Sequence, residues 1–458
     1  MHWAAVAGRL CGLSAGDNQV VSMQAMDGLV PMAQAAKPWL LPVFCWLFAL
    51  GWVWQAVERW RHREATAELG ALPMAEVDAG DGPQMTVIVP ACNEEDGIEA
   101  TLRGLLASRG LRLQIVAVND RSTDATGARM EAVAAEWAMQ CAARQQEQEM
   151  ADGEAFRHRL EVLHIAALPE GWLGKPHALA MGAERAQAEW ILCTDGDVVF
   201  AEDALARALG WAQQERADHL AVLPEWVVTS RAERALQGAM FAMTGWTTRT
   251  WKVADPKARD FLGVGAFNLM RRSSYEALGG FAALRMEVLE DLRMGWRVKQ
   301  AGMRQRVAWG QGMVRVRWAN GAWGVVRNLE KNIFALFRYR LVLALAACVG
   351  VALQVCVPVA ALVVGGSAWS VLGTGWGPDA WTLAAGLVTA AALLAVYAEQ
   401  RRRVAVPVGY VLLFPVALAI FLFAMLRSIA MTLSRGGVVW RGTLYPLEKL
   451  RAAAGRGW

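Results

Sequence analysis

Charged residues are scarce in this chain of 458 residues: they make up 19%, whereas hydrophobic residues make up 55%. That composition is too apolar for an ordinary soluble protein and indicates membrane segments. The net charge of +4 is small, so no nucleic-acid partner is expected. The seven cysteines are scattered and odd in number, without a CxxC pair. We therefore expect reduced, structural cysteines rather than a disulfide framework or a zinc site.

The N-terminal part contains one long apolar run. Residues 38–57 are uncharged and apolar, and about 20 such residues are enough to span a bilayer. The basic segment 58–63 follows them and places that side in the cytoplasm. The sequence thus predicts a transmembrane anchor at 38–57, preceded by a leader at 1–37 for which disorder is one interpretation.

The C-terminal part predicts two or three further membrane segments within 341–426. The runs 341–364 and 406–426 are long enough to cross, whereas 383–396 is short. A third crossing would leave the basic tail, 427–458, outside the cell, against the positive-inside tendency. A re-entrant last segment and an external tail therefore both remain open.

Residues 321–340 carry large apolar side chains on one helical face and basic ones elsewhere. This pattern is typical of a helix lying on an anionic leaflet. A domain helix packed on a sheet is the equal alternative.

Between the membrane segments, residues 84–320 alternate short apolar runs with helical periodicity. Such alternation predicts an α/β domain with a mostly parallel sheet flanked by helices. The expected strands are 85–89, 113–118, 160–165, 190–194 and 219–223.

Two aspartates, Asp195 and Asp197, directly follow the apolar strand 190–194. Hard carboxylate oxygens fixed at a strand end suit Mg²⁺ or Mn²⁺, which bridges to diphosphate oxygens and stabilises a leaving group's charge. A lone Asp-x-Asp is common in loops. Its position after a buried strand makes it a candidate metal site.

Two more strand ends carry polar motifs. Pro90, Asn93 and Glu94 follow the strand 85–89, where parallel sheets bind ligands, and Glu94 is a candidate nucleotide contact. The alternative for Asn93 is helix capping. Asp120 follows the next strand, and its carboxylate can accept from the imide N–H of uracil; capping is again the alternative.

Further candidates lie downstream. Lys175 opens a helix, where backbone N–H groups and a cation can face a phosphate. Asp291, with Glu290 as second choice, is the candidate base for an acceptor hydroxyl. Gly263 and Gly265 allow close backbone approach beside the acceptor, and the alternative is a glycine-kinked strand.

In this order the motifs resemble glycosyltransferase family 2, whose catalytic domain has the GT-A fold, over about residues 85–318. The resemblance implies that Asp120 contacts the nucleobase, that Asp195 and Asp197 form the metal motif with Asp197 nearest the metal, and that Asp291 is the base. The segment 171–179 (GWLGKPHAL), with VNDRSTD and the flanking membrane segments, resembles the hopene-associated glycosyltransferases and the related carotenoid glycosyltransferases.

The chain also departs from the family pattern. Asn119 stands where many relatives have Asp, and Arg121 where many have Gly, which weakens the inference about which nucleobase is bound. Processive members carry Gln-x-x-Arg-Trp. Arg317 and Trp318 are present here as candidate substrate contacts, but the Gln position is Val314.

The resemblance implies an inverting glycosyltransferase of the hexosyltransferase type in the inner (cytoplasmic) membrane, multi-pass, with a cytoplasmic catalytic domain. Its partners would be a nucleotide-sugar donor, with UDP as nucleotide, and a membrane lipid acceptor in hopanoid or related isoprenoid lipid biosynthesis. A processive polysaccharide synthase and a non-catalytic membrane scaffold are the alternatives.

Overall fold

The computed structural model describes residues 39–75, 82–148, 158–372 and 377–455, so the predicted leader 1–37 lies outside the described residues. The described chain forms two compact units. One contains the residues up to Ala56 together with Leu353–Leu394, and the other contains Val57–Ala352 together with Ala395 onward.

The first unit is made of apolar helix segments. They belong to α3 (Leu40–Arg61), α12 (Leu341–Leu372) and α13 (Pro378–Gln400). Small side chains, among them Ala49 and Ala361, form its core, and the Trp52 indole donates to Gln354 Oε1 at 2.8 Å. α13 is longer than the run 383–396 suggested. Among the described residues, four helices, these three and 408–434, are long and apolar enough to cross a membrane.

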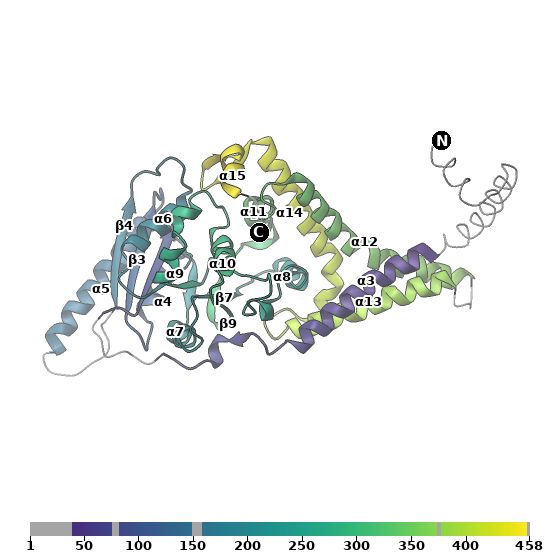
Figure 1. Ribbon diagram of the computed structural model, residues 1–458, viewed down its shortest axis with the longest axis horizontal. Helices are drawn as coiled ribbons and strands as arrows, with labels where there is room; N and C mark the ends of the chain where they lie inside the picture. The colour runs from purple at the N-terminus through teal and green to yellow at the C-terminus, as the bar shows by residue number, and fades with distance from the viewer. Residues whose placement is uncertain (1–38, 76–81, 149–157, 373–376, 456–458) are drawn as a thin grey trace, which may run out of the picture. The chain divides into compact units, whose positions relative to one another are not determined.

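The second unit is built on a nine-stranded mixed sheet (Figure 1). The strand order is β1-β9-β7-β8-β5-β2-β3-β4, with β6 paired to β9. All pairs are parallel except those that β8 makes with β5 and β7 and the pair of β6 with β9. The predicted mostly parallel α/β sheet is therefore confirmed. The strands are β1 (Ala67–Glu68), β2 (Met85–Ala91), β3 (Leu113–Asp120), β4 (Arg159–Ile165), β5 (Trp190–Cys193), β6 (Val198–Phe200), β7 (His219–Trp226), β8 (Asn268–Arg271) and β9 (Gln305–Val316).

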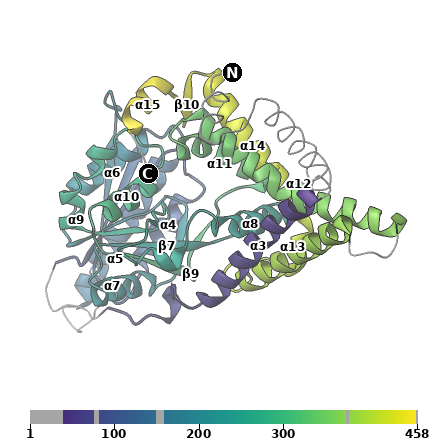
Figure 2. The same cartoon turned by 45° about the vertical axis from the view of Figure 1, so that its right-hand side comes forward.

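Helices cover both faces of this sheet (Figure 2). Alternate residues of β2 point to opposite faces: Val87 packs with α4, α5 and α7, and Ile88 packs with α6 and α10. Because both faces are buried, the central strands are apolar throughout rather than alternating. The helices are α4 (Ile98–Leu106), α5 (Thr126–Gln148), α6 (Gly174–Glu184), α7 (Ala204–Gln214), α8 (Arg231–Thr244), α9 (Arg272–Ala277) and α10 (Glu290–Gln300).

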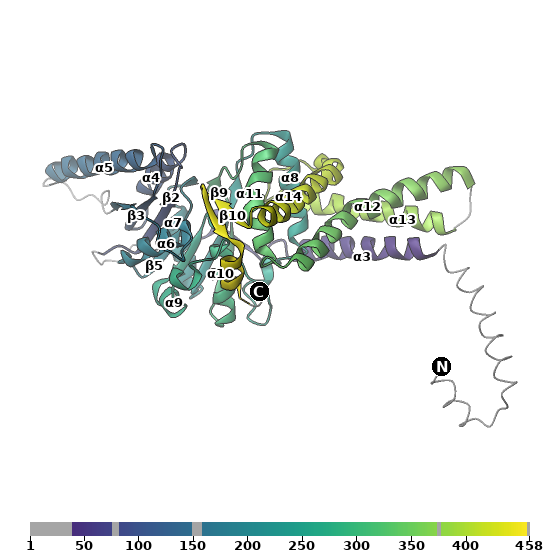
Figure 3. The same cartoon turned by 90° about the horizontal axis from the view of Figure 1, so that it is seen from above.

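The remaining elements of this unit are helices and one hairpin that lie beside the sheet. α11 (Gly321–Leu336) and α14 (Phe414–Ser434) pack side by side, and both contact α8 (Figure 3). η5 (Val408–Leu413) precedes α14, and the antiparallel hairpin of β10 (Gly437–Trp440) and β11 (Thr443–Pro446) follows it, before α15 (Leu447–Ala454). The tail after the last apolar helix is therefore folded.

Candidate active site

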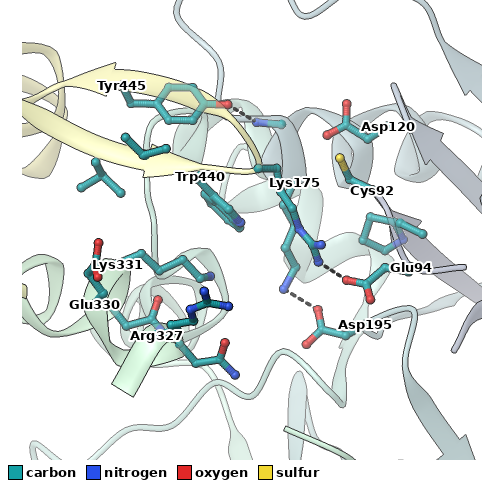
Figure 4. A pocket seen from close by; sticks show the side chains of 18 of the residues that line it. Cys92, Glu94, Asp120, Lys175, Asp195, Arg327, Glu330, Lys331, Trp440 and Tyr445 are labelled. Carbon is teal, nitrogen blue, oxygen red and sulfur yellow. Dashed lines mark hydrogen bonds and ion pairs between the residues drawn. The ribbon is translucent and has the colours of Figure 1, made fainter. Parts of the chain in front are cut away.

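A cavity of about 420 Å³ lies at the carboxyl ends of β2, β3 and β5 (Figure 4). These strands run parallel, so the loops after them meet at one edge of the sheet. The other lining residues come from α6, from α11 and from residues 431–445. Seven of the residues predicted from sequence line this cavity, namely Pro90, Glu94, Asp120, Lys175, Asp195, Asp197 and Trp318.

Three carboxylates form the acidic side of the cavity. Asp195 and Asp197 lie in the turn between β5 and β6, and Glu94 lies in the loop after β2. The hydroxyl of Thr101, on α4, donates to the Gly196 carbonyl at 3.0 Å. A neighbouring helix thus holds the turn between the two aspartates in place.

Burial and mutual repulsion disfavour the charged forms of two carboxylates on this acidic side. Burial, together with Asp195 and Glu94, raises the pKa of Asp197 to about 7. Burial also raises the pKa of Glu94, against the opposing effect of Arg441. No group of three or more acidic, histidine or cysteine side chains suited to holding a metal is found in the part of the chain that the structure describes. Mg²⁺ commonly uses one or two carboxylates and completes its shell with phosphate oxygens and water, so the residues present fit a cation that binds with a diphosphate.

Lys175 connects the acidic side of the cavity to the start of α10. Its ammonium lies 2.6 Å from Asp195 Oδ1 and 2.7 Å from Glu290 Oε1. Burial lowers the pKa of Lys175, but the two carboxylates outweigh burial and hold the pKa well above its ordinary value. Because Glu290 is held in this ion pair, Asp291 is the better placed of the two to accept a proton.

Asp291 lies in a small recess that shares Lys175 with the main cavity. Its Oδ1 accepts the N–H of Leu292 at 2.7 Å, which orients the carboxylate. Burial, and next the charge of Glu290, raise the pKa of Asp291 to about 6. A carboxylate with a pKa near the working pH is suited to general base catalysis.

The two predicted glycines bring backbone close to these carboxylates. A Cβ on Gly263 would lie 1.8 Å from the Asp291 carbonyl oxygen, and a Cβ on Gly265 would lie 2.8 Å from Asp195 Oδ2. Only residues without a side chain fit at these contacts. The alternative of a glycine-kinked strand is wrong, since β8 begins only at Asn268.

Asp120 lies at the end of β3 with its carboxylate buried. The guanidinium of Arg121 donates to it, with Nε 2.7 Å from Oδ1. A Cβ on Gly174 would lie 2.4 Å from Asp120 Oδ2, so the first turn of α6 packs directly against this pair. A nucleobase at this end would contact Asp120 and Arg121 together. The sequence analysis had named Arg121 only as a departure from the family pattern.

Asn93 is not among the residues that line the cavity. Its Oδ1 accepts the N–H of Thr123 at 2.8 Å, and its own N–H donates to Ser122 Oγ at 3.1 Å. Asn93 therefore ties the loop after β2 to the loop after β3. The capping alternative is wrong, because Gly97 is the N-cap of α4. A direct contact between Asn93 and substrate stays a prediction.

The Arg-Trp pair after β9 is divided between two environments. Trp318 lines the cavity, and its ring stacks on Trp226 with a centroid separation of 4.6 Å. Arg317 is exposed and outside the cavity lining. The predicted substrate contact of Arg317 thus has no geometric support comparable to that of Trp318.

Cations from the C-terminal third form the side of the cavity opposite the carboxylates, and sequence reasoning missed them. Arg327 and Lys331, four residues apart on α11, both line the cavity, whereas their basic pattern had left a leaflet-bound helix and a packed domain helix as equal alternatives. Burial, then the charge of Lys175, lower the pKa of Lys331 to about 8. Its ammonium lies 4.1 Å from the ring centroid of Trp440 on the hairpin.

The hairpin also bonds to the strand-end loops (Figure 4). The guanidinium of Arg441 donates to the Glu94 carboxylate and to the Asn93 carbonyl, the latter at 3.2 Å. The Gly174 N–H donates to the Tyr445 hydroxyl at 3.3 Å. Residues about 350 positions apart in sequence thus close one cavity, which no local pattern predicts.

Arg441→Ala is expected to weaken the binding of a nucleoside diphosphate about tenfold. The variant loses a charge-assisted hydrogen bond to phosphate, and such a bond is typically worth about 1.5–3 kcal/mol. The measurement is the Kd of UDP in the presence of Mn²⁺. Lys449→Ala is the matched control, because Lys449 lies in the same tail but pairs with Glu170 outside the cavity lining. Equal affinity in the two variants would contradict a donor-binding role for Arg441.

Comparison with known proteins gives distant structural likenesses and one family match. A mannosyltransferase from Pyrobaculum calidifontis, solved with GDP-Man and Mn²⁺, is 16% identical with a TM-score of 0.44, over 86% of this chain and 98% of that one. S. aureus TarS 1–349, solved with UDP, is 14% identical with a TM-score of 0.32, over 77% of this chain and 92% of that one. No curated protein sequence matches the chain. Likenesses this distant carry no argument about function.

The family match covers the part of the site that is formed by the loops after the strands. Residues 86–279 run from β2 past the end of α9 and include the loops that carry Glu94, Asp120, Asp195 and Asp197. They match the family described as Glycosyl transferase family 2. The protein is therefore a glycosyltransferase, in which residues 86–279 match the family 2 model.

Proposed function

We propose that this glycosyltransferase is an inverting enzyme that moves a sugar from a nucleoside-diphosphate sugar, with UDP as nucleotide, to a membrane lipid hydroxyl. The observation that carries the proposal is a single cavity lined by the carboxylates of Glu94, Asp195 and Asp197 and by the cations of Arg327, Lys331 and Arg441. A cavity lined by both carboxylates and cations suits a diphosphate that binds together with a divalent cation. We assign the cavity to the donor.

On this proposal Asp195 and Asp197 hold Mg²⁺ or Mn²⁺, and the bound cation would neutralise charge on the departing diphosphate. Arg441 and Lys331 bind the phosphate oxygens. Asp120 and Arg121 contact the nucleobase at the outer end of the cavity. Each of these residues lines the same cavity.

The acceptor reaction centres on Asp291. As the acceptor oxygen forms its bond to the anomeric carbon, the bond from that carbon to the diphosphate breaks, and Asp291 takes the hydroxyl proton. Attack opposite the leaving group inverts the anomeric centre. The shared Lys175 places Asp291 next to the donor cavity, as this displacement requires.

A lipid acceptor is supported by the apolar helix beside the cavity. Met431 and Thr432 of α14 line the cavity, and α14 belongs to a segment with mean hydropathy of 2.5. The resemblance of the motifs at 171–179 and 118–124 to the hopene-associated glycosyltransferases supports an acceptor among hopanoid or related isoprenoid lipids. The basic flank at 58–63 supports a cytoplasmic domain.

The test is an assay of the purified full-length protein with labelled UDP-sugars, Mn²⁺ and a bacterial lipid extract. The proposal predicts one labelled product that partitions into the organic phase. A water-soluble polymer as the product would favour a processive synthase. If neither UDP-sugars nor GDP-sugars were turned over, the proposed reaction would be contradicted.

A further inference from the structure

The last apolar segment, 408–434, has its two ends fastened to the catalytic unit. At its beginning, η5 contacts α8. Just before the segment, Gln400 Nε2 at the end of α13 donates to the Gly238 carbonyl of α8 at 3.1 Å. At its end, Arg427 and Arg435 both pair with Glu330 of α11 at 2.8 Å. The hairpin that follows reaches the donor cavity. Both ends of α14 therefore lie against the same folded unit.

The side of α14 that packs against α11 and α8 cannot lie in hydrocarbon together with those two helices. The Ser428 hydroxyl donates to the Glu330 carbonyl at 2.5 Å and accepts the Phe334 N–H at 3.0 Å. α11 carries Arg327, Glu330 and Lys331, which line a cavity built for a charged donor. A helix of 21 residues is about 31 Å long, close to the thickness of the hydrocarbon layer. If α14 crossed the membrane, α11 and α8 beside it would carry their charged side chains into the bilayer.

The opposite side of α14 is apolar from end to end. We call this surface the apolar stripe. Its members recur every three or four residues, the spacing of one helical face, and all are exposed. The stripe consists of Leu412, Val416, Ala419, Phe423, Leu426, Ala430 and Leu433. Leu412 at one end is 83% exposed and Leu433 at the other is 41% exposed.

Features at the margins of the stripe suit a single membrane surface. Trp323 of α11 is 50% exposed, with its ring 6.4 Å from that of Phe423, and tryptophan is enriched where membrane meets water. Exposed arginines precede the segment at 401–402 and follow it at Arg435. Basic residues at both ends fit one anionic leaflet better than two opposite surfaces.

We propose that residues 408–434 lie along the membrane surface on the side of the catalytic domain, with the apolar stripe in the acyl boundary of that leaflet. The chain then crosses the membrane three times, through α3, α12 and α13. The basic tail stays in the compartment of the donor cavity, which the contacts of Arg441 and Tyr445 require, so a re-entrant or surface-lying last segment is preferred to an external tail. The inference does not depend on the sugar or acceptor proposed above.

The first test measures depth along the stripe in the full-length protein. Single cysteines at Leu412, Val416, Phe423, Leu426 and Leu433, in a background without the seven native cysteines, are spin-labelled in liposomes. Collision with oxygen and with a water-soluble nickel complex reports the depth of each label. Matched controls are Leu345, Val349, Val359 and Val363, which are exposed on α12.

We expect the five stripe labels to share one shallow depth, whereas the α12 labels pass through a deep maximum. A depth maximum in the middle of the stripe would overturn the proposal. Labels that neither reagent reaches would overturn it too, because a protein surface would then cover the stripe.

A second test asks on which side the tail lies and needs no turnover. Cysteines at Glu448 on α15, an exposed residue of the tail, and at Glu276 on the catalytic unit are exposed to a membrane-impermeant maleimide in right-side-out and inside-out vesicles. The proposal predicts that both react in the same vesicle type. Reaction in opposite vesicle types would show that 408–434 crosses the membrane.

Discussion

Asp291→Asn is expected to lower the rate of sugar transfer by about 10²–10⁴-fold, the usual contribution of a general base, while nucleotide affinity stays unchanged. Asparagine keeps the oxygen that accepts the Leu292 N–H but cannot take the acceptor proton. The loss should therefore appear in kcat and not in the Kd of UDP. The measurement combines initial rates at saturating donor with direct nucleotide binding.

The pH dependence of the rate gives this prediction an independent readout. Burial and Glu290 raise the pKa of Asp291 to about 6, so the carboxylate is protonated, and inactive as a base, below that pH. In the wild-type enzyme kcat should fall as pH decreases through about 6, and the Asn variant should lack this step. Glu276→Gln, an exposed carboxylate on α9, is the control and should keep full activity. Wild-type turnover in Asp291→Asn would remove Asp291 from the mechanism.

Asp197→Ala is expected to abolish Mn²⁺-dependent binding of UDP, with a loss of affinity greater than about 100-fold. Mutation of even the outer partners of a metal ligand typically costs 10–100-fold, and here an oxygen ligand itself is removed. The fold should persist, because burial and the neighbouring carboxylates already disfavour the charged form of Asp197. We therefore expect a Tm equal to or above that of the wild type.

The control for this variant is Asp203→Ala, at the start of α7. Asp203 pairs with Arg207 at 2.6 Å and does not line the cavity, so its loss should leave Mn²⁺-dependent binding unchanged. Titration calorimetry with UDP, with and without Mn²⁺, separates the two cases. Undiminished metal-dependent binding in Asp197→Ala would contradict the metal assignment.

The central strands could be predicted from sequence because they are buried on both faces. β2, β3 and β5 read as mostly apolar runs, interrupted inside the sheet only by Thr86 and Gln114, so the sequence analysis located them to within about two residues at either end. β8 and β9 were not predicted. β8 has only four residues, and β9 alternates buried residues such as Val314 and Val316 with exposed ones such as Arg315. Their places in the sheet depend on pairing with distant strands.

The site was predictable where its residues follow strands and not where they come from remote segments. Asp120 and Asp195 follow strands whose ends must meet in a parallel sheet, so their proximity followed from topology. Arg441 and Tyr445 reach the cavity only because α14 carries the hairpin there. Lys331 has a helical pattern that suits a membrane surface as well as a cavity wall, and only the packing of α11 distinguishes the two.

The most direct test of the account is an experimental structure of the full-length protein with UDP and Mn²⁺. The account predicts the cation at Asp195 and Asp197, and the diphosphate between those carboxylates and the side chains of Lys331 and Arg441. A nucleotide bound elsewhere, or this cavity without nucleotide at saturating concentration, would contradict the assignment of the donor site and the mechanism built on it.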